Sequence, residues 1–167
     1  MVYSEYLNAA RKHLITCEVI MVEITKVDST KVHKKAAKKH LLLNLYYLTG
    51  YIFECSIKYG IYKLINFDPA LDINSLNERG LTYSDHIKHH KFIKYDEHLI
   101  SRSGGIKLVD NTSAVEPDVR HLYKTWDAEV RYWYKDINPS LEKKLTQVNL
   151  FKLFEYAKGT FDHVSKL

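Results

Sequence analysis

The chain has 167 residues, of which 46% are hydrophobic and 27% are charged, and its formal net charge is +5. These values are typical of a soluble globular protein, and we expect a single domain over residues 1–167 that is large enough to bury a core. The longest uncharged apolar run begins at Leu41 and meets Glu54 too soon to span a membrane, so a membrane protein is excluded.

The first two predicted helices are long. Apolar residues at helical spacing predict a helix over residues 4–25, with its first residue as N-cap. A second helix is predicted over residues 29–67, capped by its first or second residue and ended by Asp68-Pro69. Between residues 41 and 63 this helix is apolar around most of its circumference. A helix of that kind must lie at the centre of a bundle.

Three shorter helices are predicted in the rest of the chain. A loop over residues 68–81 leads to a helix over residues 84–100. Residues 101–116 are typical of a mobile loop, with room for a short hairpin. The fourth helix, over residues 117–133, begins with proline and has the clearest apolar stripe, and Asn-Pro opens a fifth helix over residues 138–154.

The sequence therefore predicts an all-α fold, a helical bundle of about five helices around one long central helix. Its expected core includes Leu45, Leu48, Ile52, Ile57, Leu122, Trp126 and Val130. Cys17 and Cys55 fall inside apolar helical patterns and lack the spacing of metal ligands, so we expect buried free thiols. Free thiols, and charged residues instead of a secretory apolar segment in the first twenty positions, indicate a cytoplasmic protein.

Five lysines share one face at the start of the second helix: Lys31, Lys34, Lys35, Lys38 and Lys39. Positive charge at a helix N-terminus opposes the macrodipole, so these residues stabilise the helix poorly, and an anionic partner would explain them. Two interpretations stay open, a phosphate-binding site and a solvated surface.

The third predicted helix begins with several histidines. His86 and His90 have the spacing of a two-histidine metal pair, but the glutamate that hydrolytic zinc helices place after the first histidine is missing. We therefore expect exposed or capping histidines, and we predict no metal site and no cofactor.

Glu54 and Lys58 stand four residues apart in the most apolar part of the second helix. Buried charges need partners, and Arg131 or Tyr132 of the fourth helix is the natural candidate. We expect a buried structural network in which Arg131 points toward Glu54, and a ligand site is the alternative.

These residues carry a resemblance to a known family. Gly50-Tyr51-Ile52-Phe53-Glu54-Cys55-Ser56-Ile57-Lys58 resembles the Gly-Tyr-x-x-Glu-x-x-x-Lys signature of HEPN (higher eukaryotes and prokaryotes nucleotide-binding) domains. His90-Lys91-Phe92 is similar to the family's His-x-apolar element, although the Asp that commonly follows the His is missing. The segment from Trp126 to Tyr132 resembles its aromatic-x-x-x-x-Arg-Tyr element.

The resemblance implies an up-and-down bundle, usually a homodimer, from a toxin–antitoxin or antiviral defence system. Many members are metal-independent ribonucleases in which four to six residues separate an Arg from the His that follows it. No His follows Arg120 or Arg131 at that spacing. Arg79 and His86 match it, but about one such match is expected by chance.

We therefore expect a HEPN-like module that binds nucleotide, RNA or a partner protein, such as a nucleotidyltransferase-like antitoxin, without the usual ribonuclease motif. The resemblance implies Glu54, Lys58, His90, Arg131 and Tyr132 as ligand-binding residues. The alternatives are a metal-independent ribonuclease with Arg79 and His86 as catalytic candidates, and a helical scaffold without enzymatic activity.

Overall fold

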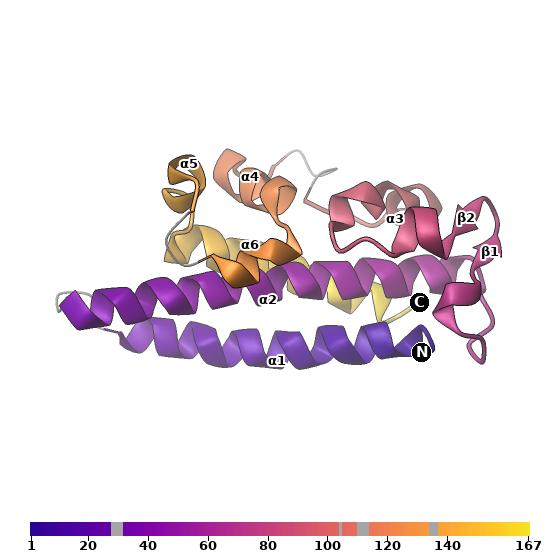
Figure 1. Cartoon of the computed structure of the whole chain (residues 1–167), viewed down its shortest axis with the longest axis horizontal. Helices are drawn as coiled ribbons and strands as arrows, with labels where there is room; N and C mark the ends of the chain where they lie inside the picture. The colour runs from indigo at the N-terminus through magenta and orange to yellow at the C-terminus, as the bar shows by residue number, and fades with distance from the viewer. Residues whose placement is uncertain (28–31, 104, 110–113, 134–136) are drawn as a thin grey trace.

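A computed structural model describes residues 1–27, 32–103, 105–109, 114–133 and 137–167. It is mainly helical, as expected, and its two long helices lie side by side and antiparallel (Figure 1). Helix α1 covers Ser4–Lys26 and helix α2 covers Val32–Leu64, which at 1.5 Å per residue is about 50 Å long. Ser4 is the first helical residue and not the cap, and the expected caps of α2 lie outside the described residues.

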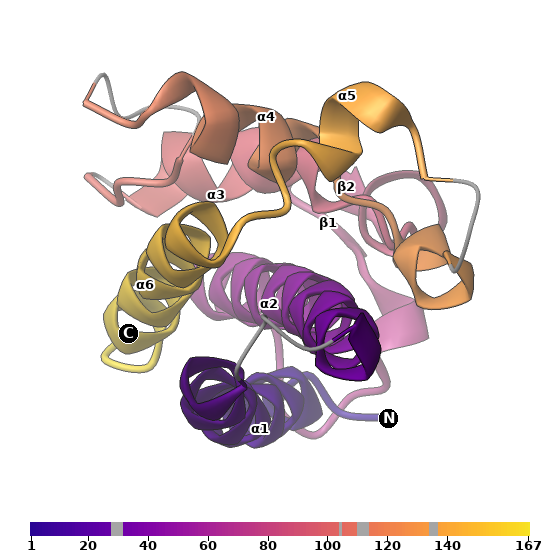
Figure 2. The same ribbon diagram turned by 90° about the vertical axis from the view of Figure 1, so that its left-hand side faces the viewer.

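Helix α2 is the central helix, as its apolar circumference predicts. In Figure 2, α2 is surrounded by α1 below, α6 (Gln147–Val164) to one side and the shorter helices above. These shorter helices are α3 (Asp96–Ser103), α4 (Pro117–Thr125) and α5 (Pro139–Glu142), and the 3-10 helix η4 (Ala128–Tyr132) also packs on α2. Within the described part of the chain, none of the helices is both long and apolar enough to cross a bilayer.

A small hairpin follows α2 where a loop is predicted. After the 3-10 turn η1 (Ile73–Ser75), strands β1 (Asn77–Glu78) and β2 (Leu81–Thr82) pair antiparallel. Arg79 and Gly80 connect them with φ values of 52° and 76°. Two residues with positive φ are what a type I′ hairpin turn requires, and glycine adopts this conformation at little cost.

The single helix predicted over residues 84–100 is wrong. The segment forms a π-helical turn η2 (Tyr83–Ile87), a 3-10 turn η3 (Phe92–Lys94) and then α3. Lys91 has an extended backbone between the two turns, so the helical path is broken there. The break places Phe92 in the core against Trp126, with the two rings stacked at 5.1 Å.

The helices predicted over residues 117–133 and 138–154 are also interrupted. Trp126 is extended, with ψ of 137°, and Asp127 accepts a hydrogen bond from the backbone N–H of Glu129, so a new helical turn starts at η4. Further on, α5 ends at Glu142 and Thr146 caps α6 by accepting from the N–H of Asn149. Both breaks occur at residues that cap helices well.

The predicted core is confirmed except at Leu48, which is half-buried. Trp126 packs so closely on α2 that a Cβ added to Gly50 would lie 1.9 Å from its indole ring. Tyr46 donates a hydrogen bond of 2.7 Å to the carbonyl of Leu122, which joins α2 to α4. Cys17 and Cys55 are buried free thiols, as expected.

The expected mobile loop over 101–116 begins within α3, and residues 104 and 110–113 lie outside the described residues. In its described part, Ile106, Leu108, Val109 and Val115 are buried. No strand forms among these described residues, and the hairpin that the structure does describe lies at 77–82.

Candidate functional site

A buried ion pair lies in the second half of α2. Lys58 Nζ lies 2.8 Å from Glu54 Oε1, and each residue is 3% exposed. The ammonium group also lies 5.5 Å from the ring centroid of Tyr6 and 5.4 Å from that of Tyr95. Aromatic faces attract cations, so these rings replace part of the hydration that Lys58 loses on burial.

His90 connects this pair to the surface. Its Nδ1 lies 3.1 Å from Glu54 Oε1, yet its side chain is 63% exposed. An ionised carboxylate only accepts hydrogen bonds, so Nδ1 carries the donated proton, and a neutral ring then has its lone pair on Nε2. Glu54 therefore orients an exposed imidazole, and its other oxygen, Oε2, is buried without a partner among the described residues.

The thiol and the hydroxyl group beside this pair, those of Cys55 and Tyr95, stay protonated at neutral pH. Burial, with a smaller contribution from Glu54, raises the pKa of the Cys55 thiol to about 12. Burial and Glu54 also raise the pKa of the Tyr95 hydroxyl well above its ordinary value. Cys55 and Tyr95 therefore supply no thiolate or phenolate here, and His90 is the exposed member of the network.

Tyr51, one turn before Glu54, is the centre of an aromatic surface. Its ring centroid lies 4.9 Å from that of Tyr47, 5.3 Å from Trp126, 5.6 Å from His13 and 6.3 Å from His90. Burial and the neighbouring Tyr47 raise the pKa of the Tyr51 hydroxyl. The sequence signature contained Tyr51, but the grouping of these rings depends on contacts that α2 alone does not reveal.

The expected contact between Arg131 and Glu54 is wrong. Glu54 pairs with Lys58 and His90, whereas Arg131 is exposed and its guanidinium lies 4.6 Å from the ring centroid of Tyr132. Tyr132 is 73% exposed, so its hydroxyl does not reach the buried pair. The break at Trp126 is the physical reason, because it removes these two residues from the stripe of a continuous helix.

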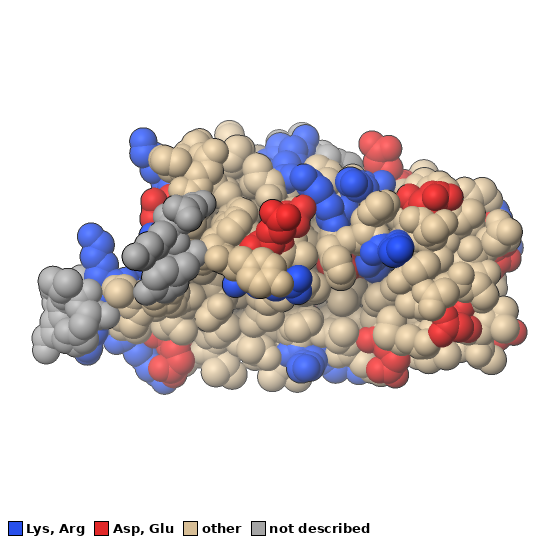
Figure 3. Space-filling view, in the orientation of Figure 1, with Lys and Arg blue, Asp and Glu red and all other residues tan. Residues whose placement is uncertain are grey.

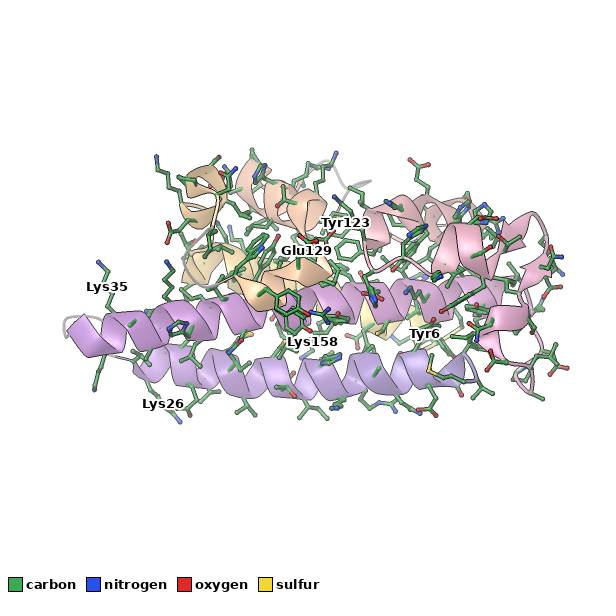
Figure 4. All side chains as sticks on the ribbon, in the orientation of Figure 1. Tyr6, Lys26, Lys35, Tyr123, Glu129 and Lys158 are labelled. Atoms are coloured by element: carbon green, nitrogen blue, oxygen red, sulfur yellow. The ribbon has the colours of Figure 1, made fainter. Side chains whose placement is uncertain are left out.

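Arg131 faces the aromatic surface instead. Lost hydration lowers the pKa of its guanidinium, but the hydroxyl groups of Tyr132, Tyr47 and Tyr51 outweigh this effect and raise it overall. Figure 4 shows η4, with Glu129 labelled, lying across the middle of α2 on the side that faces the viewer.

A pocket opens between η4 and α2 at this place. Its volume is about 300 Å³, and its lining combines aromatic, cationic and amide side chains with two aliphatic ones. The lining residues are His40, Leu43, Asn44, Tyr47, Val130, Arg131, Tyr132 and Trp133. We call this the aromatic pocket. It unites two of the five expected ligand-binding residues. The other three form the Glu54–Lys58–His90 network, with Glu54 and Lys58 on α2 and His90 on the segment between η2 and η3.

Four of the five lysines of the expected anion site are described, and Lys31 lies outside the described residues. Lys39 pairs with Glu142 of α5 at 2.5 Å. In the part of the chain that the structure describes, Lys34, Lys35 and Lys38 form no ion pair. On the face shown in Figure 3, several positive side chains lie at the end of the molecule where α2 begins, with acidic side chains beside them.

The weaker catalytic candidates do not form a site together. Arg79 is exposed in the hairpin turn, and His86 Nδ1 accepts a hydrogen bond from the N–H of Thr82. The His86 ring lies 5.3 Å from that of His98, and no interaction links it to Arg79 among the described residues. His86 thus caps a turn, as the capping interpretation expects, and the described residues contain no cluster that could hold a metal ion.

Comparisons with protein-family models, with curated proteins and with solved structures find no match to this chain.

Proposed function

We propose that this chain is a helical module that binds single-stranded RNA or a nucleotide on the face formed by the first half of α2 and by η4. The observation that carries the proposal is the aromatic pocket, where Arg131 lies on the exposed ring of Tyr132 beside His40 and Asn44. Flat aromatic groups on which bases stack, next to cations for the phosphates, are the usual means of binding single strands.

The lysines at the start of α2 extend this face. Lys38 and Lys39 precede His40 on the same helix, and Lys39 shares its groove with Leu43, which also lines the aromatic pocket. A strand with one base in the pocket would therefore have basic side chains along the path of its backbone. Stacking contributes about 1–3 kcal/mol per base, and each neutralised phosphate adds to the salt dependence of binding.

The resemblance to HEPN domains supports RNA or a nucleotide as the ligand. It also implies a role in a toxin–antitoxin or antiviral defence system. In that setting we propose a homodimer and a nucleotidyltransferase-like antitoxin or another defence protein as partners. Light scattering of the purified chain, alone and with the product of a neighbouring gene, tests both partners directly.

The binding test is a titration of a fluorescently labelled 12-nucleotide RNA, followed by anisotropy at several salt concentrations. Tyr132→Ala should weaken binding about 5- to 150-fold, the loss of one stacked base. Lys166→Gln, an exposed change at the end of the chain beyond α6, is the control and should bind like the unchanged protein. If Tyr132→Ala binds equally well, the aromatic pocket is not the RNA site.

RNA cleavage is the second candidate function, and one observation favours it. His90 is exposed and its Nδ1 is engaged by Glu54, which leaves Nε2 as the nitrogen that could act as a general base. His90 would accept the proton of an RNA 2′-hydroxyl, and Arg131 would stabilise the charge on the phosphate. Labelled RNA incubated with EDTA should be cut by the unchanged protein and not by His90→Gln, and intact RNA in both samples excludes this function.

A further inference from the structure

A second groove, which shares Leu43 with the aromatic pocket, lies between α2 and the segment that carries α5. Its volume is about 230 Å³. Its floor is aliphatic and its rim is charged: Leu42, Leu43, Ile137 and Leu145 form the floor, and Lys35, Lys38, Lys39 and Glu142 form the rim. RNA has no alkyl group that would fill such a floor, so the proposed function leaves this groove unexplained.

We propose that this groove binds an amphiphilic carboxylate, a molecule with one carboxylate on an alkyl chain of about eight carbons. The length follows from the lining, because Lys35 and Leu43 are eight residues apart on α2, about 12 Å at 1.5 Å per residue, which is close to the length of an extended eight-carbon carboxylate. The aliphatic floor removes the chain from water, and the lysines at the rim attract the carboxylate.

The protein itself shows how a carboxylate meets this rim. Glu142 of α5 places its Oε1 2.5 Å from Lys39 Nζ, beside the aliphatic floor. Lys38 and Lys35 stand one and four residues earlier on α2 and have no carboxylate partner among the described residues. Figure 4 shows Lys35 projecting from the start of α2 on the side where α5 lies. The rim thus carries lysine charges that no carboxylate of the described residues neutralises. A carboxylate on an alkyl chain complements both this rim and the aliphatic floor.

Isothermal titration calorimetry with hexanoate, heptanoate, octanoate and decanoate tests the proposal. Each methylene from six to eight carbons should tighten Kd about four-fold, the equivalent of about 0.8 kcal/mol per buried methylene. The gain should stop near eight carbons, when the groove is full. Octylamine, with the same chain and the opposite charge, should not bind.

Two variants assign the site, and one serves as control. Leu42→Trp should fill the groove and abolish octanoate binding, and the half-buried position of Leu42 allows the change without opening the core. Lys38→Gln should weaken all chain lengths by a similar factor of about two to five, as for an exposed ion pair. Lys166→Gln should bind octanoate like the unchanged protein.

Some results would overturn the proposal: no saturable octanoate binding, equal binding of octylamine, or unchanged binding by Leu42→Trp with an unchanged circular dichroism spectrum. If Leu42→Trp does not fold, Leu42→Ala replaces it and should weaken octanoate binding, and equal affinity then contradicts the site. Although Lys38 serves both proposals, Leu42→Trp and Tyr132→Ala tell them apart, because Leu42 does not line the aromatic pocket and Tyr132 does not line this groove.

Discussion

In the second half of α2, Glu54 and Lys58 are buried and lie 2.8 Å apart, whereas near its start Lys35 and Lys38 stand on the rim of an open groove. Both regions carry charge on one helix. The buried pair is neutral overall, and aromatic rings and a histidine surround it. The exposed lysines have no such compensation among the described residues.

The difference indicates a division of roles along the helix. A buried charge that lost its partner would lower the free energy of unfolding by several kcal/mol. The second half of α2 therefore tolerates few changes. An exposed cation contributes little to folding and stays available to a ligand. Stability should therefore depend on the second half of α2 and on the side chains that pack against it. Binding should depend on the first half of α2 and on η4.

The largest expected effect is a loss of stability where Trp126 packs against α2. Trp126→Ala removes a buried ring that fits against Gly50 and stacks on Phe92, and it should lower the free energy of unfolding by about 3–5 kcal/mol. Urea denaturation followed by circular dichroism measures the change. An unfolding midpoint equal to that of the unchanged protein would contradict the packing described here.

The second prediction concerns the buried pair. Glu54→Gln leaves the Lys58 ammonium without its carboxylate and should destabilise the fold by about 3 kcal/mol. The double variant Glu54→Gln, Lys58→Met removes both charges and should recover part of that loss. If the double variant is as unstable as the sum of both single changes, the two residues are not energetically coupled.

The third prediction concerns pH. Burial, Arg102 and His86 lower the pKa of His98, and burial and Lys12 lower that of His13. The unfolded chain then binds these protons at a higher pH than the folded one, so stability is highest above the unfolded pKa of about 6.5 and falls as pH decreases through it. Melting temperatures between about pH 7.5 and 5.5 should show this decrease, and His98→Gln should make it smaller. An equal decrease in the variant would exclude His98 as a cause.

The smallest effect on stability is expected at Arg131. Because the side chain is exposed and has no ion pair among the described residues, Arg131→Gln should leave the melting temperature unchanged. The same variant should weaken RNA binding, since Arg131 lines the aromatic pocket. A clear loss of stability would show that Arg131 has a structural role after all.

Long periodic segments made much of this fold predictable from the sequence. The apolar stripe of α1 and the apolar circumference of α2 identified both helices and the central position of α2. The shorter elements were missed where a capping residue interrupts an apolar stripe. Asp127 starts a new turn within the stripe that runs through Trp126, and side-chain periodicity alone does not report such a break.

The candidate site was likewise predictable only in part, where its residues share one helix or carry the HEPN resemblance. Glu54 and Lys58 were recognised as a pair because both lie on one helix, four residues apart, and His90 was named with them through the HEPN resemblance. The aromatic pocket was missed, because it forms between α2 and η4, and its position depends on the break at Trp126. The lysine-rimmed groove likewise needs Leu145 and Ile137 to meet α2, which are about a hundred residues away in sequence.

The division of roles along α2 is tested most directly by the salt dependence of RNA affinity in the triple variant Lys34→Gln, Lys35→Gln, Lys38→Gln. If these lysines contact phosphates, the slope of log affinity against log salt should flatten by about 1.4–2.1, at about 0.7 per contact for two or three contacts. The melting temperature should stay that of the unchanged protein. An unchanged slope, or a triple variant that no longer folds, would contradict the division.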